Sequence, residues 1–435
     1  MADLPSAFLE RMKIQLGSSY DAFIAGCSKP AEKGVRVNTL KISAEDFERL
    51  APFELDGKVA WEKSGYYVKG HAIGKTLLHQ AGAFYVQEPS AMSAVPELEV
   101  QPGDKVLDMC AAPGGKSTQI AQYLCGEGFL VSNEINRKRS VALCENIERM
   151  GCTNVLVTTA EPEALSYFFD SFFDKILVDA PCSGEGMFRK DKEVIYTWSE
   201  GIVRKCAARQ KEILSEAAKM LAAGGRLVYS TCTFSEDEDE KQIASFLETH
   251  PDFRLVRMKK LYPHEIRGEG HFVSVLERTD GARKSSSQMK GDSERATHVR
   301  LYREWEHDTL SEPICNVYSG AAGKVHTFPE GSPKIAVCGN SSIDVRRNNL
   351  LGDITDGKRF EPSHTLAMRL KPSQVRHVDV DADTAMQYLK GFPIDCPGAD
   401  SGWSVAMYEG MPLGWCKVVS GTAKNHLPKG LRMQM

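Results

Sequence analysis

Two cysteines follow the ends of two predicted strands, in a pattern that suits nucleophilic chemistry. Cys182 lies within Asp179-Ala-Pro-Cys-Ser-Gly-Glu-Gly186 after an apolar strand predicted at 174–179, and Cys232 follows a strand predicted at 225–230. If both strands belong to one parallel sheet, the two thiols emerge at the same edge, where ligands bind in such sheets. A lone cysteine is more often a small buried hydrophobe, and that alternative stays open for each. Small neighbouring residues at both positions, and the nearby Asp179, favour a shared site.

A second stretch of the chain predicts a strand, a tight turn and a helix start. An apolar strand predicted at 105–109 precedes the turn, and the helix opens near Lys116. Small residues let a ligand approach the backbone of the turn, and the free N–H groups of the first helical turn favour an anion. A proline in the turn presets one backbone angle. The turn consists of Cys110, Ala111, Ala112, Pro113, Gly114, Gly115 and Lys116.

Spacing decides between the ligands that this turn can hold. A phosphate-binding loop needs glycine where this chain has Cys110, and a dinucleotide loop needs a G-x-G-x-x-G run, which is absent. S-adenosylmethionine (SAM) needs a compact turn for its carboxylate and a second acid about twenty residues on for its ribose hydroxyls. Glu134 follows the next apolar run, Phe129–Asn133, at that distance. The spacing favours SAM, with NAD and plain core packing as alternatives.

A thiol beside a methyl donor suits methylation of C5 in cytosine. This carbon is too electron-poor to attack a methyl sulfonium, but addition of a thiolate to C6 makes it nucleophilic if an acid protonates or hydrogen-bonds N3. A thiol with a pKa of about 8.5 is only a few per cent ionised at neutral pH, so the site must activate it. A helix N-terminus or a nearby cation can do so. The base must also leave its stack to enter the pocket.

The alternation of strands and helices from 101 to about 278 predicts the fold that would position these residues. It is typical of an α/β protein with a Rossmann-like, doubly wound parallel sheet. The strand ends would then bring the SAM turn, Glu134, Asp179 and both cysteines to one edge. The predicted strands are 105–109, 128–133, 154–158, 174–179, 225–230 and 271–277, and the predicted helices are 116–125, 136–150, 202–222 and 236–249.

A chain of 435 residues is too long for a single core. Helix-like periodicity at 4–26 and short strands predict a small α+β RNA-binding domain at 1–78, followed by the catalytic domain at 79–278. Residues 279–298 are rich in Gly, Ser and charge, which predicts a linker. A small mixed domain at 299–370 and a β-barrel-like module at 371–435 complete the chain, because short apolar runs there alternate with Gly and Pro.

Composition bounds the class of protein. Apolar residues make up 42% and charged residues 26%, as in ordinary soluble proteins, and no run is long enough to span a membrane. Twelve irregularly spaced cysteines and the lack of a signal-peptide pattern predict a cytoplasmic protein without a disulfide framework. Nothing suggests a structural metal. The net charge of −4 is weak evidence against a nucleic-acid partner, although basic residues cluster locally.

At this point the motifs resemble those of a known family. Cys110–Lys116, Asp179–Gly186 and Ser230-Thr-Cys-Thr233 are similar to the signature motifs of the Nol/Nop/Sun family of RNA cytosine-5 methyltransferases. Three further runs resemble its other motifs: Arg36-Val-Asn-Thr-Leu40, Gln87-Glu-Pro-Ser-Ala-Met92, and Pro263-His264 with Gly268-Glu-Gly-His-Phe272. The resemblance covers roughly 1–278.

The resemblance implies a role for each site residue. Cys232 would be the nucleophile that attacks C6, Cys182 would assist release of the methylated base, and Asp179 would face the methyl donor and N3 of the cytosine. Glu134 would bind the ribose of SAM. Glu161 stands where the family usually has an adenine-binding Asp, and this longer acid is expected to reach the adenine amine. Arg139 would support the cofactor or be a solvated helix residue.

The C-terminal part extends the resemblance to the RsmF-type branch, whose members methylate bacterial small-subunit (16S) rRNA and carry a PUA-like RNA-binding module. The matching runs are Arg359–Ala367, Gly414–Lys417 and Lys424–Arg432. In this module Trp403 and Trp415 are predicted as core, and Lys424, His426, Lys429 and Arg432 as phosphate contacts or exposed residues. A tRNA cytosine-5 methyltransferase and a non-catalytic RNA-binding ribosome assembly factor are the rival hypotheses. The oligomeric state is left open.

Overall fold

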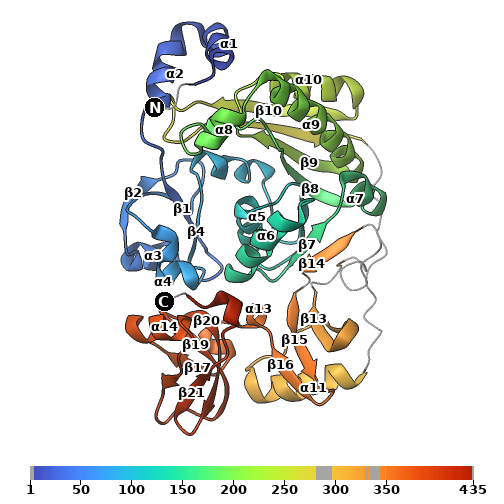
Figure 1. Ribbon diagram of the computed structural model, residues 1–435. Helices are drawn as coiled ribbons and strands as arrows, with labels where there is room; N and C mark the ends of the chain where they lie inside the picture. The colour runs from blue at the N-terminus through green and yellow to red at the C-terminus, as the bar shows by residue number, and fades with distance from the viewer. Residues whose placement is uncertain (1–3, 281–295, 329–331, 333–342, 348, 434–435) are drawn as a thin grey trace.

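The computed structural model of the protein describes residues 4–280, 296–328, 332, 343–347 and 349–433. The predicted linker at 279–298 lies mostly outside these residues. A large central sheet carries the catalytic region, with an N-terminal sheet on one side and two C-terminal sheets below it (Figure 1). Among the described helices, none is long and apolar enough to cross a bilayer.

The central sheet confirms the predicted Rossmann-like, doubly wound fold. Its strand order is β10-β11-β9-β8-β5-β6-β7-β14. The strands from β9 to β7 run parallel, whereas β11, β10 and β14 pair antiparallel with their neighbours. The strands are β5 (Lys105–Asp108), β6 (Phe129–Asn133), β7 (Val155–Thr159), β8 (Phe173–Asp179), β9 (Leu221–Thr231), β10 (Phe253–Leu261), β11 (His271–Arg278) and β14 (Asp344–Arg347).

Both faces of this sheet are covered, which explains why its strands read as continuous apolar runs. Along β5, Leu107 belongs to the core beneath one layer of helices and Val106 to the core beneath the other. In Figure 1 the two layers lie on opposite sides of the strands. The first layer contains α7 (Pro162–Phe168), α9 (Glu200–Met220) and α10 (Glu240–Thr249), and the second contains α5 (Gly115–Leu124) and α6 (Arg137–Arg149).

The N-terminal region contains a helical hairpin and a small antiparallel sheet with the order β2-β3-β1-β4. The helix-like pattern at 4–26 is interrupted at Gly17, whose φ of 52° ends the first helix. The boundary at 78 stays a prediction, although β4 joins this sheet beyond it. The elements are α1 (Ser6–Leu16), α2 (Tyr20–Cys27), β1 (Gly34–Val37), α3 (Ala44–Leu50), β2 (Glu54–Lys58), β3 (Gly65–Lys69), α4 (Leu77–Gln80) and β4 (Phe84–Val86).

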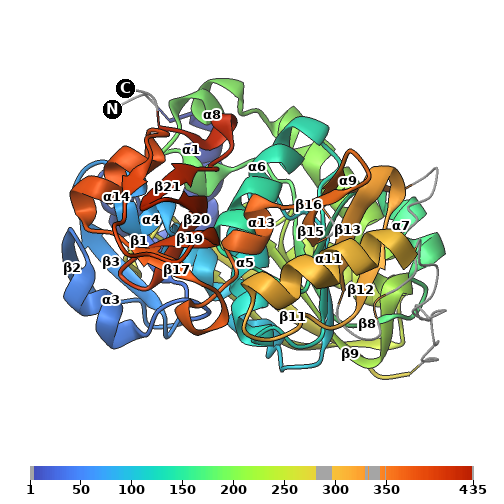
Figure 2. The same ribbon diagram turned by 90° about the horizontal axis from the view of Figure 1, so that it is seen from below.

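The C-terminal region forms two further sheets, which face the viewer in Figure 2. The first has the order β12-β13-β15-β16 and packs against α11 (Ala296–Thr309). The second has the order β17-β19-β20-β21-β18 and packs its apolar face against the N-terminal sheet. Their strands are β12 (Val317–Ser319), β13 (Lys324–Thr327), β15 (Leu350–Thr355), β16 (Arg359–Pro362), β17 (His377–Asp379), β18 (Ile394–Asp395), β19 (Gly402–Tyr408), β20 (Met411–Val419) and β21 (Thr422–Asn425).

Several element boundaries differ from the sequence predictions. The helix predicted at 202–222 ends at Met220, because residues from Leu221 onward belong to β9. The helix predicted at 236–249 begins only at Glu240, since the acidic residues before it form a turn. Strands β10 and β14 were not predicted at all. They extend the two edges of the sheet.

Candidate active site

The parallel strands end at one edge of the sheet, beside a large cavity. Asp179 at the end of β8 pairs in register with Ser230 of β9, and Asp108 at the end of β5 lies beside Leu177. The cavity has a volume of about 1140 Å³, enough for a nucleoside-sized ligand and a base. The predicted site residues that line it are Cys110, Ala112, Glu134, Arg139, Glu161, Asp179, Cys182 and Cys232.

The turn after β5 packs closely against α6. Gly114 has φ of 114°, and a Cβ atom there would lie 3.2 Å from Leu143 Cδ1. Asn146 Nδ2 donates to the Pro113 carbonyl at 2.9 Å, and Arg139 Nη2 donates to the Ala112 carbonyl at 2.8 Å. These contacts fix the loop in front of Gly115, where α5 begins with its free N–H groups.

Asp108 anchors this turn from below. Ser117 Oγ donates to Asp108 Oδ2 at 2.6 Å, which ties the end of β5 to the first turn of α5. Burial raises the pKa of Asp108 to about 7, even though the hydrogen bond from Ser117 opposes the shift. The side chain is therefore held by the fold and is absent from the cavity wall. The residues that line the cavity also do not include the predicted cofactor residues Ala111, Pro113, Gly114, Gly115 and Lys116.

Two carboxylates stand at the ends of the next two strands. Glu134, which follows β6, is nearly buried, with Oε1 accepting from the Asn136 N–H at 2.9 Å and Oε2 lying 3.3 Å from Arg139 Nη1. Glu161 is exposed at the start of α7, at the end of β7. Carboxylates at these two places can accept hydrogen bonds from ribose hydroxyls and from an adenine amine. Arg139 has the supporting contacts that the sequence left open.

Asp179 is the most strongly held charge of the site. Lys116 Nζ lies 2.8 Å from Asp179 Oδ2, and Ser230 Oγ donates to Oδ1 at 2.8 Å. Burial raises the pKa of Asp179, but the Lys116 ammonium and the other contacts outweigh burial and bring the pKa below its usual value. Asp179 is therefore a carboxylate at neutral pH.

Cys182 and Cys232 meet at this edge with their sulfur atoms 3.2 Å apart, and both are free thiols. Hydrogen bonding with Cys232, together with burial, raises the pKa of Cys182 well above its ordinary value. The raised pKa favours the protonated form of Cys182. Among the groups that raise the pKa of Lys116 is Cys232, so a cation stands within electrostatic reach of this sulfur.

Two buried carboxylates hold the loops that carry the cysteines. Glu238 accepts from the Ser183 N–H at 2.9 Å, from the Ser183 hydroxyl, and from Gln210 Nε2 at 3.0 Å. Glu185 accepts from the Phe234 N–H at 3.1 Å and forms an ion pair with Arg11 Nη2 at 2.6 Å. The loop after β8 and the loop after β9 are therefore tied to each other and to the N-terminal hairpin.

Comparison with known proteins identifies the family. Residues 95–280 match the model of the 16S rRNA methyltransferase RsmB/F, 4–89 that of the N-terminal domain of 16S rRNA methyltransferase RsmF, and 375–433 that of the methyltransferase RsmF PUA domain. The chain is 31% identical to ribosomal RNA small subunit methyltransferase F of Vibrio vulnificus (strain YJ016), across 98% of this chain and 97% of that protein. The chain belongs to the RsmF family.

The chain is also similar to other relatives and to solved structures. The small subunit methyltransferase F of Escherichia coli O139:H28 is 39% identical, over 98% of this chain and 96% of the relative. A methyltransferase homolog protein from Pyrococcus horikoshii is 28% identical with a TM-score of 0.55, covering 63% of this chain and all of that one (100%). NSun6 from the same organism, solved with SFG, shares the fold at 21% identity and a TM-score of 0.58, over 64% of this chain and 99% of its own.

The comparisons confirm the resemblance read from the motifs, and the RsmF family is SAM-dependent. The residues present fit that methyl donor, because Cys110 and Ala112 of the turn, Glu134 and Glu161 line one cavity in the order that a nucleoside with an amino-acid tail requires. Their individual roles stay predictions. When bound, SAM supplies an electrophilic methyl group.

Two features of the site escaped the sequence analysis. His271 at the start of β11 has Nε2 3.8 Å from Asp179 Oδ1, and neither of its ring nitrogens has a hydrogen-bond partner among the described residues. Burial, with Lys116 nearby, lowers its pKa to about 4, so the ring is neutral. Glu238 lies within an acidic run that resembles a solvated surface. Glu238 follows the strand predicted at 225–230, and this position is the signal in the sequence that could have indicated a structural role.

In the PUA domain, the two tryptophans differ. Trp415 is 2% exposed and donates its indole N–H to the Ser363 carbonyl at 2.8 Å, so it is core as predicted. Trp403 is half-buried, and Lys417 Nζ lies 5.4 Å from the centre of its ring. Lys424, His426 and Lys429 are exposed, while Arg432 Nε donates to the Leu427 carbonyl at 3.2 Å. Their contact with RNA stays a prediction.

Proposed function

We propose that the chain methylates cytosine C5 in 16S rRNA through a transient covalent bond between Cys232 and C6 of the base. The single observation that carries this proposal is the meeting of two free thiols, 3.2 Å apart, with an ion-paired carboxylate at the edge of a methyltransferase sheet. Methyl transfer to an oxygen or nitrogen needs neither cysteine. Two thiols at the target position are explained by a carbon that must first be activated.

In the first half of the reaction, the Cys232 thiolate adds to C6 and the C5=C6 electron pair becomes available at C5. Lys116 stabilises the thiolate beforehand as a nearby cation. Asp179, ionised by its own environment, accepts a hydrogen bond from the 4-amino group and, once N3 has taken up a proton from water in the cavity, a second one from N3. C5 then forms its new bond to the methyl group, whose bond to the sulfonium sulfur of the donor breaks and leaves its electron pair on that sulfur. N3 returns its proton to water when the C5=C6 double bond re-forms.

In the second half, the C5 proton is lost and the C5=C6 double bond re-forms as the C6–S bond breaks. The C5 proton passes to water in the cavity, and the electron pair of the C6–S bond returns to Cys232. Because Cys182 is protonated and its sulfur lies within hydrogen-bond reach of Cys232, it stabilises the departing sulfur. Cys182 thereby assists release of the methylated base.

The relatives support rRNA as the substrate class. Those that match over nearly the whole chain are named ribosomal RNA small subunit methyltransferase F, and the last domain matches the RsmF PUA model. A ribosomal substrate places the activity in the cytoplasm. The tRNA alternative is tested by comparing the incorporation of labelled methyl groups into tRNA and into small subunits.

The experiment that tests the proposed nucleophile is Cys232→Ala. We expect this variant to lose methylation while it binds SAM as the unchanged protein does, because the thiol contributes to the reaction and not to the cofactor turn. Methyl incorporation into small-subunit rRNA and calorimetric SAM binding are the two measurements. Cys206→Ala, at a half-buried thiol on α9, is the matched control and should keep full activity. Near-normal turnover by Cys232→Ala would overthrow the mechanism.

Bisulfite sequencing of 16S rRNA from cells with and without the gene tests the product. A cytidine that resists conversion only when the gene is present is the expected result. If SAM affinity is absent and no such cytidine is found, the chain is a non-catalytic assembly factor.

A further inference from the structure

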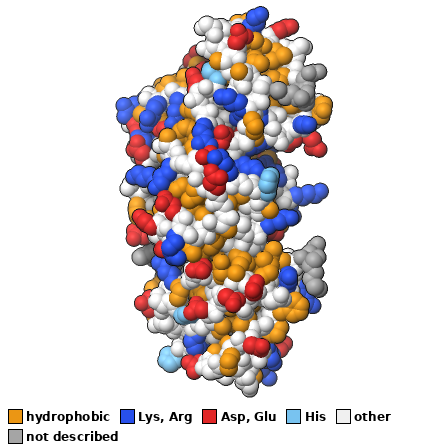
Figure 3. All heavy atoms as spheres, turned by 90° about the vertical axis from the view of Figure 1, so that its left-hand side faces the viewer, with side chains coloured by type: hydrophobic (Ala, Val, Ile, Leu, Met, Phe, Trp, Pro, Cys, Tyr) orange, Lys and Arg blue, Asp and Glu red, His pale blue; other side chains and the backbone are white. Residues whose placement is uncertain are grey.

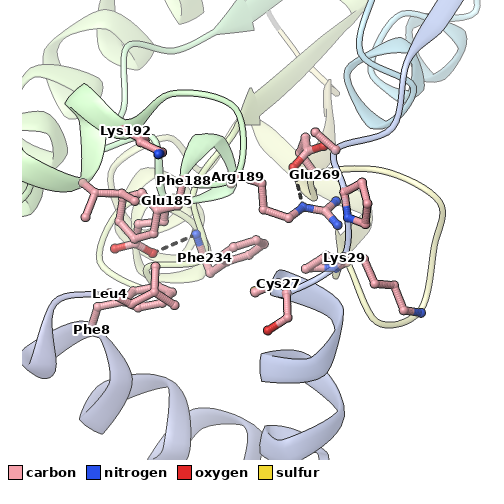
Figure 4. A pocket seen from close by; sticks show the side chains of 16 residues that line it. Leu4, Phe8, Cys27, Lys29, Glu185, Phe188, Arg189, Lys192, Phe234 and Glu269 are labelled. Atoms are coloured by element: carbon pink, nitrogen blue, oxygen red, sulfur yellow. Dashed lines mark hydrogen bonds and ion pairs between the residues drawn. The ribbon is translucent and has the colours of Figure 1, made fainter. Parts of the chain in front are cut away.

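A second, smaller pocket lies between the N-terminal hairpin and the catalytic domain (Figure 4). Its volume is about 170 Å³, and it is separate from the large cavity that holds the cofactor turn. Phe8 of α1, Phe188, Ile195 and Phe234 form its apolar walls. Lys29 and Lys192 stand at its rim, and both are exposed.

The loops that carry the two catalytic cysteines form one wall of this pocket. The Gly186 N–H donates to the Cys232 carbonyl at 2.8 Å, and a Cβ atom at Gly186 would lie 3.0 Å from that oxygen. Gly186 and Phe234 line the pocket, while Cys182 and Cys232 in the same two loops line the large cavity. The pocket and the catalytic site are therefore two sides of one pair of loops.

Most polar groups of the pocket wall already have hydrogen-bond partners within the protein. The Arg189 guanidinium donates from Nε to Glu269 Oε2 at 2.6 Å, from Nη1 to the Gly26 carbonyl at 3.1 Å and from Nη2 to the Gly268 carbonyl at 2.5 Å. Glu269 is 2% exposed, and among the described residues its Oε1 has no hydrogen-bond partner. A buried carboxylate oxygen without a donor is costly, so the wall offers an acceptor to a ligand.

The rim of the pocket carries positive charge, from Lys29 and Lys192. The described residues provide no carboxylate within ion-pair distance of Lys29 or Lys192, in contrast to Lys69, which is paired with Glu54 and Asp56. Figure 3, which shows the left-hand side of Figure 1, has Lys and Arg gathered across the middle of that face. Apolar walls, an unused acceptor and two unpaired cations at the mouth match a nucleotide, with its flat base, its amino group and its flanking phosphates.

We propose that this pocket binds a nucleobase adjacent to the target cytidine in the RNA strand. The base donates a hydrogen bond to the wall from an amino group or a ring N–H, because the wall offers an acceptor at Glu269 Oε1 and its guanidinium donors are already used. The proposal rests on the proposed function for the identity of the strand. Binding there would make the enzyme specific for the RNA sequence next to the target, because the two loops that carry the cysteines would contact the flanking base.

The test is a thermodynamic cycle between a filled pocket and a missing base. The probe is a single-stranded 16S rRNA oligonucleotide centred on the cytidine found by bisulfite sequencing, with an abasic residue placed in turn at each of the flanking positions. Ala31→Trp fills the pocket from a half-buried position on its wall. RNA affinity is measured by fluorescence anisotropy with the full chain and S-adenosylhomocysteine.

With the unchanged protein, one flanking abasic residue should weaken binding about tenfold or more. Ala31→Trp should weaken binding of the intact RNA by a similar factor and then show less than a twofold further loss with the abasic probe, because the two changes remove the same contact. If, at every flanking position, the affinity loss of Ala31→Trp and that of the abasic residue are independent, so that the combined loss is their product, the pocket does not hold a base and the proposal is wrong.

A charge reversal at the rim checks the same idea without filling the pocket. Lys192→Glu should weaken RNA binding and reduce its salt dependence, whereas Lys358→Glu, at an exposed lysine of the β15–β16 turn, should change neither. Equal effects of the two would contradict the proposal. Bisulfite sequencing reports on the proposed function and the cycle reports on the pocket, so either can fail while the other holds.

Discussion

At the scale of single residues, the site depends on how one carboxylate and one ammonium are kept charged beneath a cavity. Lys116 is 10% exposed and Asp179 is 30% exposed, and each would shift toward its neutral form if it were buried alone. Their mutual attraction at 2.8 Å reverses that tendency for Asp179, whose pKa lies below its usual value. The pair provides a cation for the thiolate and an acceptor for the base.

Lys116→Met therefore gives a prediction about pH. A lowered pKa keeps Asp179 ionised as the pH falls, so the acid limb of the pH–rate profile lies at low pH in the unchanged protein. Without the ammonium, burial acts unopposed and raises the pKa of Asp179, so the limb should move to higher pH. We also expect kcat to fall by about a hundredfold, as when a fixed charge at a reacting group is removed.

The measurement is the rate of methyl transfer across the pH range, with SAM concentration well above its dissociation constant. Lys116→Arg keeps the charge and is the matched control, which should leave the acid limb close to its original position. An unmoved limb in Lys116→Met would show that the ion pair does not set the charge of Asp179.

At the scale of elements, the N-terminal sheet positions the cofactor turn through one side chain. Arg36 on β1 is fully buried and donates from Nε to Gln87 Oε1 at 2.9 Å. Its Nη2 donates to the Gly115 carbonyl at 3.0 Å and to Thr118 Oγ1 at 2.7 Å. The motif Arg36–Leu40 therefore links the N-terminal sheet to the first turn of α5.

Arg36→Met should destabilise the protein by about 2–4 kcal/mol, because it leaves buried acceptors without a donor. It should also weaken SAM binding, since the start of α5 loses its anchor. Urea unfolding and calorimetric SAM titration measure the two effects. Arg49→Met, at an exposed ion pair, should change stability by less than about 0.5 kcal/mol. Unaltered SAM affinity in Arg36→Met would show that the N-terminal sheet does not position the cofactor turn through this side chain.

The sequence predicted the parallel strands of the central sheet but not its edge strands β10 and β14, because only the buried strands have a local apolar pattern. Val106 and Leu107 are buried on opposite faces, so β5 reads as an apolar run that periodicity detects. Most of β10 is exposed, so it has no such pattern. β14 exists as a strand of this sheet because Asp344–Arg347 pairs with β7, a contact between distant parts of the chain that no local pattern encodes.

The candidate site was predictable where it depends on the ends of parallel strands, and not where it depends on how helices pack. Motif positions brought Asp179, Cys182 and Cys232 together, since strand ends of a parallel sheet share an edge. The ion pair with Lys116 and the burial of Glu238 depend on how α5 and α10 pack, which spacing along the chain does not reveal.

At the scale of the whole molecule, the domains share their cores. Apolar residues of β1, β3 and β4 pack in one cluster with residues of β19, β20 and α14 (Ala382–Leu389). On the other side, α13 (His364–Ala367) packs against α6, where the Thr365 hydroxyl hydrogen-bonds Glu148. These contacts hold the PUA domain in a fixed place relative to the catalytic edge, so RNA bound to both is positioned by the fold.

This arrangement predicts the effect of charge changes in the PUA domain. The double variant Lys424→Glu/Lys429→Glu should weaken binding of the rRNA substrate about tenfold or more and reduce its salt dependence, with a slope change of about 0.7 for each lost phosphate contact. SAM affinity should stay the same, because both lysines lie in the C-terminal domain, away from the cofactor turn. RNA titrations at several salt concentrations measure this. A change confined to SAM binding would contradict the predicted phosphate role.

The central claim, a covalent bond from Cys232 to the base, is tested most directly by trapping it. Cys182→Ala should still form the bond and methylate C5, but it should release the product slowly, so a protein–RNA complex should survive on a denaturing gel after incubation with SAM and small-subunit rRNA. The double variant Cys182→Ala/Cys232→Ala should give no such band. Full turnover by Cys182→Ala without a band, or a band that persists in the double variant, would contradict the account.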